Sequence, residues 1–405
     1  MSDSRPKRLG LIVNPVAGVG GRVGLKGSDG LDILRRALAL GAVRDAPRRV
    51  GLALARLARL CEHIEIVTCP GEMGADEARA AGFEPVVLEG VAGAGSDERR
   101  ELLPDGVPVT TSADTEAAAR ALRDLGVDLL LFAGGDGTAR DICHAVDGDL
   151  PVLGVPAGVK IHSAVYATTP ARAGDLAALY LHDRPAAVRL RESEVMDIDE
   201  DAFRDDRVSA RLYGYLQVPY ERSMVQSAKA GGVAGDAADL RAIAQDVVNE
   251  MDPGVVYLLG PGTTMRSVAE ALGVTKTLLG VDAVRDHALL ANDLNERQIL
   301  DLIGGGPARI VVTVIGGQGY IFGRGNQQLS ADVIRRVGGD GVVVVATQTK
   351  LLSLRGGPLL VDTGDPALDE QLSGYHQVVT NLGHRTMYRV AGATGDEPAP
   401  APSAS

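Results

Sequence analysis

One segment limits the possible folds of this chain more than any other: the apolar run at 129–132, followed by Gly134-Gly-Asp-Gly-Thr138. Four consecutive large apolar residues are typical of a strand buried on both faces of a parallel sheet. Glycines directly after such a strand let backbone amides approach a phosphate without an intervening Cβ, and Asp136 or Thr138 can cap the helix that follows. The segment therefore predicts a strand, a phosphate-binding loop and a helix, although a capped turn without a ligand would have the same local sequence.

Strand and helix patterns alternate through the first part of the chain, as expected for a doubly wound parallel sheet. The strands are predicted at 9–13, 64–68, 85–88, 128–132 and 151–155, and the helices at 31–40, 50–60, 76–81, 115–125 and 138–146. After a further helix at 171–182, charged and apolar residues alternate over 188–199, which fits a strand of an antiparallel or mixed sheet.

We therefore predict an α/β protein with three parts. Residues 1–165 form an N-terminal doubly wound α/β domain that contains the glycine loop, and residues 166–391 form a second, β-rich domain. Further strands are predicted in the second domain at 255–259, 309–314, 342–346 and 359–362, and helices at 264–272 and 296–303. Residues 392–405, with alternating proline and alanine near the end, are predicted to be a disordered tail.

Charge and composition exclude several classes of partner. The 41 basic and 53 acidic side chains give a formal net charge of −12, which repels nucleic acid and anionic membranes. Four phenylalanines and no tryptophan leave few platforms for stacking on bases, and no apolar run is long enough to span a membrane. The three cysteines show no Cys-x-x-Cys spacing, and the seven histidines form no cluster. We therefore expect a cytoplasmic, reduced protein that binds neither nucleic acid nor membranes and has no dedicated metal site.

Two further polar loops follow predicted strands of the same sheet. Asn14-Pro-Val-Ala-Gly18 comes after the first strand, and Gly154-Val-Pro-Ala-Gly158 begins the segment after the fifth strand. Because the carboxyl ends of parallel strands share one edge, we expect both loops to lie beside Gly134. The residues after Gly158 include Lys160, which could neutralise phosphate charge, and two candidates for substrate contact, His162 and Ser163. An ordinary Asn-Pro turn, a surface lysine and a hydrogen-bonded histidine are the alternatives.

The second half of the chain contains a similar strand–glycine–hydroxyl pattern. An apolar run at 255–259 leads into Gly260-Pro-Gly-Thr-Thr264, which places glycine and two hydroxyl groups at the start of a helix. A second glycine-rich stretch at 315–326 would offer Gln318, Arg324 and Asn326 as fixed donors, but bulges and hairpin turns explain its glycines equally well.

These motifs resemble those of a known superfamily. Gly134-Gly-Asp-Gly-Thr138 is similar to the signature shared by NAD kinases, diacylglycerol kinases and phosphofructokinases. Asn14-Pro-Val-Ala-Gly18 resembles the start of lipid kinases and ATP-NAD kinase-like proteins, and Pro261-Gly-Thr-Thr264 resembles a shortened NAD kinase Thr-Pro-x-Gly-Ser-Thr turn. Over 9–390 the whole pattern most resembles the ATP-NAD kinase-like, or AcoX-like, branch. The motifs of Walker-type phosphate binders, Rossmann dehydrogenases and α/β-hydrolases are absent from the sequence.

The resemblance implies a kinase that uses ATP or inorganic polyphosphate to phosphorylate the 2′-hydroxyl of NAD, giving NADP. Asp136 would be the catalytic residue, which accepts the hydroxyl proton or holds the Mg²⁺ that accompanies the nucleotide. Glu194 corresponds to the acidic member of an Asn-Glu pair that contacts the nucleotide substrate, but Ser193 replaces the asparagine. The implied phosphate-binding residues are Asn14, Gly18, Gly134, Gly135, Gly137, Thr138, Gly158, Lys160, Gly262, Thr263 and Thr264, and the implied substrate contacts are His162, Ser163 and Glu194.

Two other functions remain compatible with the sequence. The first is a kinase for a different alcohol, such as a lipid or a small polyol, and the second is a nucleotide-binding accessory protein without turnover. Retention of Asp136 argues against the second, because a protein that only binds gains nothing from a carboxylate placed against phosphate charge. We expect a small-molecule nucleotide substrate and a homo-oligomer.

Overall fold

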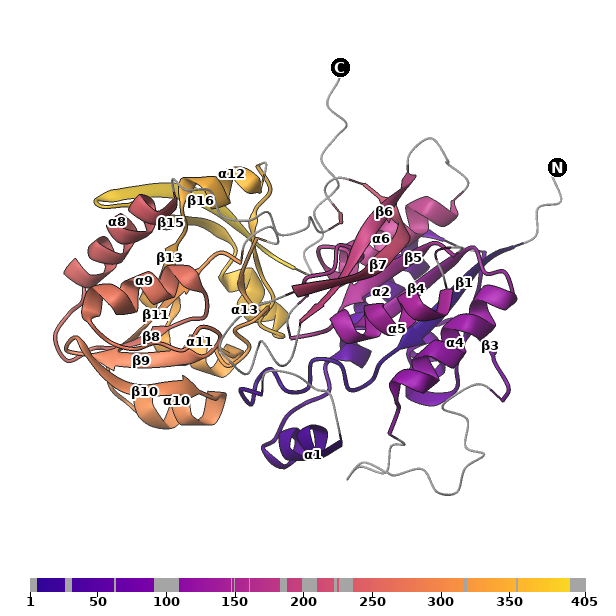
Figure 1. Ribbon diagram of the computed structural model, residues 1–405, viewed down its shortest axis with the longest axis horizontal. Coiled ribbons are helices and arrows are strands. Elements are labelled where there is room, and N and C mark those ends of the chain that lie inside the picture. Colours follow the sequence, from indigo (N-terminus) through magenta and orange to yellow (C-terminus); the bar gives the residue numbers. More distant parts are fainter. Residues whose placement is uncertain are drawn as a thin grey trace, which may run out of the picture. The chain divides into compact units, whose positions relative to one another are not determined.

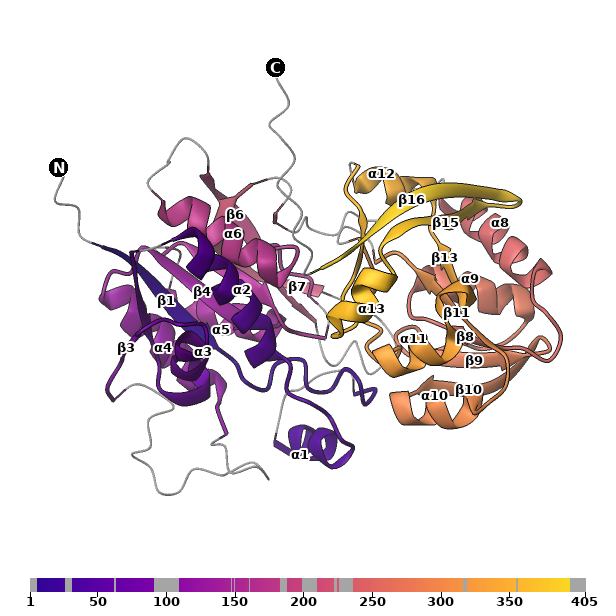
Figure 2. The same cartoon turned by 180° about the vertical axis from the view of Figure 1, so that it is seen from behind.

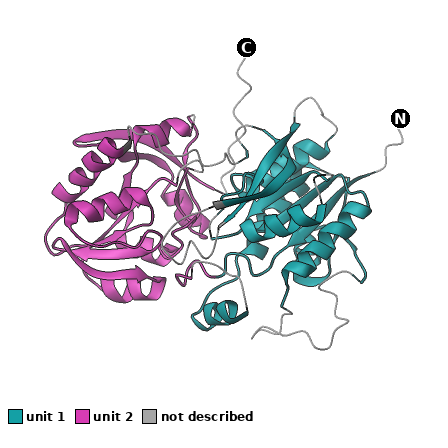
Figure 3. Ribbon diagram, viewed as in Figure 1, with its two compact units in different colours: residues 1–19, 27–228 teal, residues 20–26, 229–405 magenta. Residues whose placement is uncertain are grey.

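A computed structural model describes most of the chain, in two compact units (Figures 1 and 3). The described residues are 6–25, 31–61, 63–90, 109–146, 148, 150–159, 161–182, 188–198, 210–221, 224–225, 236–315, 319–354 and 356–393. Unit 1 contains residues 1–19 and 27–228, and unit 2 contains residues 20–26 and 229–405. None of the helices in these described ranges is long and apolar enough to cross a lipid bilayer.

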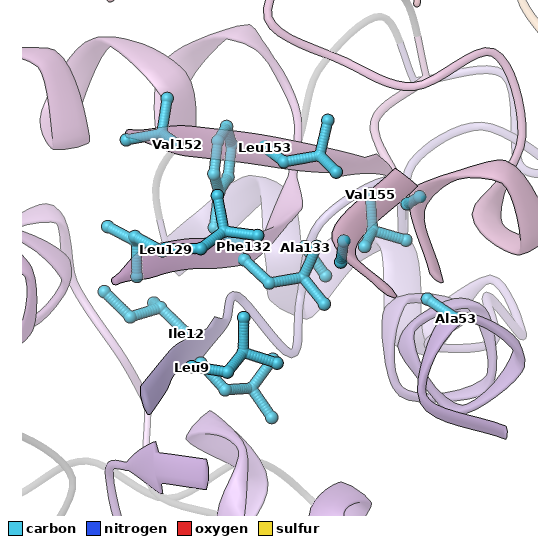
Figure 4. Close-up of a cluster of buried hydrophobic side chains, with 14 of the residues drawn as sticks. Leu9, Ile12, Ala53, Leu129, Phe132, Ala133, Val152, Leu153 and Val155 are labelled. Atoms are coloured by element: carbon cyan, nitrogen blue, oxygen red, sulfur yellow. The ribbon is translucent and has the colours of Figure 1, made fainter. Parts of the chain in front are cut away.

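Unit 1 is built on a five-stranded parallel sheet with the strand order β3-β2-β1-β4-β5. The strands are β1 (Lys7–Val13), β2 (Ile64–Thr68), β3 (Val86–Val87), β4 (Leu129–Gly134) and β5 (Val152–Pro156). Every residue of β4 is buried, which is the reason for its continuous apolar sequence. Figure 4 shows Phe132 of β4 among Ile12 of β1 and Val152 and Leu153 of β5. The predicted parallel sheet is confirmed.

Helices cover both faces of this sheet, because the order of strands reverses direction between β1 and β4. The helices of unit 1 are α1 (Leu31–Ala39), α2 (Ala46–Leu60), α3 (Ala75–Ala80), α4 (Ser112–Asp124), α5 (Asp136–Val146) and α6 (Pro170–Leu181). Helix α2 packs against α6, and α4 packs against α5. Gly174 of α6 lies so close to α2 that a Cβ there would be 2.2 Å from the carbonyl oxygen of Ala53. Arg56 and Asp175 add an ion pair of 2.6 Å between the same two helices.

An antiparallel pair of strands completes unit 1. β6 (Arg189–Ile198) pairs with β7 (Ala210–Tyr220), as the charged and apolar alternation of 188–199 predicts. Val195, Leu216 and Val218 from this pair are buried in the same core as the parallel sheet. Unit 1 therefore extends to residue 228 instead of ending at the expected boundary of 165, because both α6 and the β6–β7 pair bury their apolar side chains in its core.

Unit 2 is built on a nine-stranded mixed sheet with the order β10-β9-β8-β11-β13-β15-β16-β14-β12 (Figure 2). Its strands are β8 (Val256–Leu259), β9 (Val281–Arg285), β10 (Ala288–Leu294), β11 (Ala308–Thr313), β12 (Tyr320–Phe322), β13 (Val342–Val345), β14 (Leu359–Val361), β15 (Gly374–Asn381) and β16 (His384–Gly392). Its helices are α8 (Asp236–Asn249), α9 (Thr263–Leu272), α10 (Glu296–Ile303), α11 (Ala331–Val337), α12 (Gln348–Ser353) and α13 (Pro366–Gln371). The strand-rich second region is thus confirmed.

Strands β8, β11, β13 and β15 run parallel in the middle of this sheet, and sequence patterns located the first three of them. The hairpin of β15 and β16 was not predicted, because its exposed residues interrupt the apolar pattern. Strand β16 ends at Gly392, the first residue of the expected tail, and the backbone N–H of Ala393 donates to the carbonyl of Val361 at 2.8 Å. The remainder of the expected tail, 394–405, lies outside the described residues.

One buried carboxyl group in unit 1 has an altered ionisation. Glu77 of α3 is 7% exposed, and its Oε2 atom has no hydrogen-bond partner within the described part of the chain. Burial raises the pKa of Glu77 from 4.5 to about 7, with a further contribution from Asp76 and Glu72, while Arg44 opposes the rise. The folded protein therefore keeps a proton on Glu77 over a pH range in which the unfolded chain has lost it.

This proton makes the stability of the protein depend on pH. Between pH 4.5 and about 7 the folded state binds more protons than the unfolded state, so the free energy of unfolding should fall as the pH rises through this range. The contribution of Glu77 to this fall should be up to about 3 kcal/mol. The free energy of unfolding, measured by urea denaturation, should differ less between pH 5 and pH 8 for Glu77→Gln than for the wild type. Substitution of the exposed Glu84 by glutamine is the control, and an unchanged difference in Glu77→Gln would contradict the prediction.

Candidate functional site

Three loops meet at the carboxyl ends of β1, β4 and β5, which are neighbours in the sheet of unit 1. We call them the carboxyl-edge loops, and they comprise residues 14–19, 134–138 and 156–163. The side-chain Nδ2 of Asn14 donates to Oγ1 of Thr138 at 3.0 Å, which joins the first loop to the second. The backbone N–H groups of Ala157 and Gly158 both donate to the carbonyl of Gly134 at 2.9 Å, which joins the second to the third. The structure thus brings these predicted loops together.

Three glycines of these loops lie where other atoms leave little or no room for a Cβ. A Cβ at Gly134 would lie 2.4 Å from the Cβ of Thr138, and a Cβ at Gly135 would lie 3.2 Å from the Cα of Gly158. Gly18 has a φ of +76°, and a Cβ there would lie 2.2 Å from the carbonyl oxygen of Ala157. A side chain at Gly18 or Gly135 would therefore press on the loop after β5, and one at Gly134 would displace Thr138, whether or not a ligand is bound.

Asp136 lies at the centre of this arrangement as the first residue of α5, with only 6% of its surface exposed. Its Oδ2 accepts hydrogen bonds from the backbone N–H of His162 at 2.7 Å and interacts with the ring Nδ1 of His162 at 3.0 Å. Its Oδ1 accepts the backbone N–H of Ser163 at 3.0 Å. A single carboxylate therefore holds the start of α5 against the loop at 161–163.

Ser163 extends this network to β6. Its hydroxyl donates to the carbonyl of Met196 at 2.7 Å and accepts the N–H of Met196 at 3.0 Å. In the same place the N–H of Ala164 donates to the carbonyl of Glu194 at 2.9 Å, so Glu194 lies beside the loop that contains His162 and Ser163. Ser193 is buried, whereas Glu194 is partly exposed. The three residues expected to contact substrate are thus neighbours in the structure.

The predicted residues of unit 2 form a separate polar cluster at the carboxyl ends of β8, β11 and β13. Thr264 is fully buried in the first turn of α9, and its Oγ1 accepts a hydrogen bond from the hydroxyl of Thr313 at 3.2 Å. The ammonium group of Lys350 donates to the hydroxyl oxygens of Thr264 at 2.9 Å and Thr313 at 3.1 Å. Gly262 precedes the helix with a φ of +108°, and Thr263 is the first helical residue.

Several residues of these sites were not found from the sequence. Lys350 and Thr313 lie 86 and 49 residues from Thr264, so no local pattern connects them. The only sequence signal was a hydroxyl and a lysine, Thr347 and Lys350, directly after the β13 strand. Tyr166, whose hydroxyl donates to the carbonyl of Gly135 at 2.6 Å, was also missed. Of the residues that were predicted, Lys160 lies outside the described residues.

Both oxygens of Asp136 face N–H groups of the loop at 161–163. Within the described ranges there is no group of three or more His, Cys, Asp or Glu side chains that could hold a metal ion.

Two protein-family models match the chain. A family model described as the ATP-NAD kinase N-terminal domain matches residues 9–184, and one described as the ATP-NAD kinase C-terminal domain matches residues 252–390. No curated protein and no solved structure matches the chain.

The packing of the carboxyl-edge loops can be tested with a pair of glycine substitutions. Gly18 and Gly41 both have positive φ, at +76° and +85°, but a Cβ at Gly41 would have no atom within 4 Å. Gly41→Ala should therefore cost only the conformational penalty of about 1–2 kcal/mol. Gly18→Ala should cost about 1–3 kcal/mol more, because its Cβ would collide with the carbonyl of Ala157. Equal midpoints for the two variants in urea denaturation would show that the first and third loops are not in contact in solution.

Proposed function

Because the chain belongs to the ATP-NAD kinase family, we propose that it transfers a phosphoryl group from ATP or inorganic polyphosphate to the 2′-hydroxyl of NAD, giving NADP. The family match covers both halves of the chain and identifies an NAD kinase-type phosphotransferase. Our proposal concerns the phosphoryl acceptor, NAD, and the phosphoryl donor, ATP or polyphosphate.

One observation supports the proposal most strongly: the three carboxyl-edge loops are hydrogen-bonded to one another at the N-terminus of α5. The bonds from Asn14 to Thr138 and from Gly158 to Gly134 hold backbone and hydroxyl groups of different strands in one place. The carboxyl edge of a doubly wound sheet is where such folds bind nucleotides, and the start of a helix favours phosphate. These bonds fix the start of α5, and backbone N–H groups at a helix start stabilise the charge that develops on a transferring phosphoryl group.

We assign the roles of the individual residues accordingly. Phosphate would be bound in unit 1 by Asn14, Gly18, Gly134, Gly135, Gly137, Thr138, Gly158 and Lys160, and in unit 2 by Gly262, Thr263 and Thr264. His162, Ser163 and Glu194 would contact the acceptor, and Asp136 would be essential for the transfer. Mg²⁺ would enter with the substrate phosphates and neutralise their charge, as is usual for this ion. A cytoplasmic location, a homo-oligomer and the absence of nucleic-acid binding remain predictions.

Ser193 stands where NAD kinases have an asparagine. We therefore keep a second candidate function, a kinase for another alcohol. The test is a panel in which the purified protein and Mg²⁺ are incubated with ATP or polyphosphate and with NAD, NADH, diacylglycerol or small polyols. Formation of NADP is the expected result. A phosphorylated product from a different acceptor would replace NAD as the substrate, and binding of nucleotide without any product would favour an accessory protein.

Asp136→Asn should lower turnover at least about 10²-fold, whether the carboxylate takes the proton itself or acts through a neighbour. The substitution should also cost about 1–3 kcal/mol of stability, because an amide cannot accept hydrogen bonds at both of its ends. The control is Asp175→Asn, which removes a buried carboxylate from its ion pair with Arg56 in α2. That variant should be destabilised but retain its turnover when assayed well below its thermal midpoint. If Asp136→Asn and Asp175→Asn have similar turnover, Asp136 is not essential for phosphoryl transfer.

Gly135→Val should weaken nucleotide binding, because a side chain would occupy the approach to the backbone of the glycine loop and press on Gly158. Gly51→Val is the matched control, since a Cβ at Gly51 in α2 would have no atom within 4 Å. Isothermal titration with ATP should give an affinity at least about tenfold lower for Gly135→Val, equivalent to about 1.4 kcal/mol. Wild-type affinity in a folded Gly135→Val variant would show that this loop does not hold phosphate.

A further inference from the structure

The carboxylate of Asp136 is occupied by the protein's own donors. Its Oδ1 accepts the N–H of Ser163 at 3.0 Å, and its Oδ2 accepts the N–H of His162 at 2.7 Å and lies 3.0 Å from the ring Nδ1. Only 6% of the residue is exposed, and three N–H donors of residues 162 and 163 already face its two oxygens, so little of the carboxylate is open to a substrate hydroxyl group. Asp136 is therefore poorly placed to take a proton directly from an attacking hydroxyl group.

The ring of His162 is placed for this task instead. A carboxylate oxygen can only accept a hydrogen bond, so the contact between Nδ1 and Oδ2 of Asp136 requires the proton of the neutral ring to be on Nδ1. The other ring nitrogen, Nε2, then carries a lone pair and can accept a proton. The backbone N–H of His162 is bound to the same carboxylate, so both the loop and the ring are held by Asp136. The side chain retains 16% exposure, compared with 6% for Asp136.

We propose that Nε2 of His162 accepts the proton of the attacking hydroxyl group, and that Asp136 positions the ring and fixes its tautomer. This inference rests on the proposed phosphotransferase function. The hydroxyl oxygen forms a bond to the terminal phosphorus of the donor while the bond from that phosphorus to the leaving nucleoside diphosphate, or shortened polyphosphate, breaks. The hydroxyl proton passes to Nε2, and the resulting imidazolium returns it to water before the next turnover. The negative charge of Asp136 offsets the positive charge that the ring gains in this step.

The elements bonded to the loop at 161–164 are α5, through Asp136, and β6, through Glu194 and Met196, and both carry further charged groups. Arg140, four residues after Asp136 in α5, is bound to Asp197 of β6 at 2.6 Å and to Asp141 at 3.3 Å. Glu194 of β6 reaches the loop through its carbonyl oxygen, which accepts the N–H of Ala164. Asp136 is thus the carboxylate that bonds directly to the ring, and Lys160 lies outside the described residues.

The test is the pH dependence of kcat/KM for the wild type and for His162→Asn. The asparagine amide can still donate to Asp136 but offers no acceptor at the position of Nε2. We expect turnover to fall about 10²- to 10⁴-fold with little change in the KM of the donor. The low-pH limb of the wild-type kcat/KM profile should be absent from the residual activity of His162→Asn, because that variant has lost the proton acceptor. His144→Asn is the matched control, because His144 is on the same helix as Asp136 and its ring contacts Tyr213.

A second substitution separates the two roles. If Asp136 acts only through His162, the double variant Asp136→Asn/His162→Asn should be no slower than the slower single variant. If the double variant instead loses turnover by the product of the two single fold-losses, Asp136 acts independently of His162, and its assignment as a positioning residue is overturned. Thermal midpoints for all variants, together with His162→Gln as an alternative replacement, distinguish a lost proton acceptor from a lost fold.

A readout without turnover comes from nitrogen NMR of the histidine side chains. The neutral ring of His162 should carry its proton on Nδ1 in the wild type, and a proton on Nε2 would overturn the proposal. If the wild type turns over and His162→Asn is equally active, the role of His162 is overturned but the proposed function stands. Absence of turnover with every acceptor and both donors would overturn the proposed function and the role of His162 together.

Discussion

The functional region of unit 1 depends on one interaction, the set of hydrogen bonds that the carboxylate of Asp136 accepts from residues 162 and 163. The carboxylate joins the first residue of α5 to a segment 26 residues further along the chain. Ser163 continues the connection to β6 through Met196. Without Asp136 the loop after β5 would lose the group that orients it, and two backbone N–H groups would need another acceptor. Asp136 therefore positions two of the candidate substrate contacts, His162 and Ser163, directly.

The glycine motif has two explanations that reinforce each other. Gly134 and Gly18 are necessary because Thr138 and the carbonyl of Ala157 occupy the space where their Cβ atoms would be. The same close packing leaves backbone amides uncovered by side chains, which is the property that a phosphate site needs. A glycine required by the fold is thus also suited to a ligand, and a motif of this kind cannot by itself distinguish the two requirements.

Both units repeat one arrangement at the carboxyl end of a buried parallel strand. In unit 1, β4 leads through glycines to Thr138, which receives a hydrogen bond from Asn14 of the neighbouring strand's loop. In unit 2, β8 leads through Gly262 to Thr264, which receives bonds from Thr313 at the end of the neighbouring strand β11 and from Lys350 after β13, the next strand of the sheet. In each case a threonine in the first turn of a helix is hydrogen-bonded to a residue at or just beyond the carboxyl end of the adjacent strand. Parallel neighbours make this possible because their carboxyl ends lie at one edge.

The sequence by itself determined the elements that rest on local patterns. Strand β4 was evident from its apolar run, and the glycine turn and α5 from the residues directly after it. The hydrogen bond of His162 to Asp136, the ammonium of Lys350 on Thr264 and the extension of unit 1 to residue 228 were decided by the tertiary structure. Periodicity and turn residues report on neighbours within a few positions of the chain. These contacts instead join residues that the strand order brings together, and a chain's local pattern does not specify which strands become adjacent.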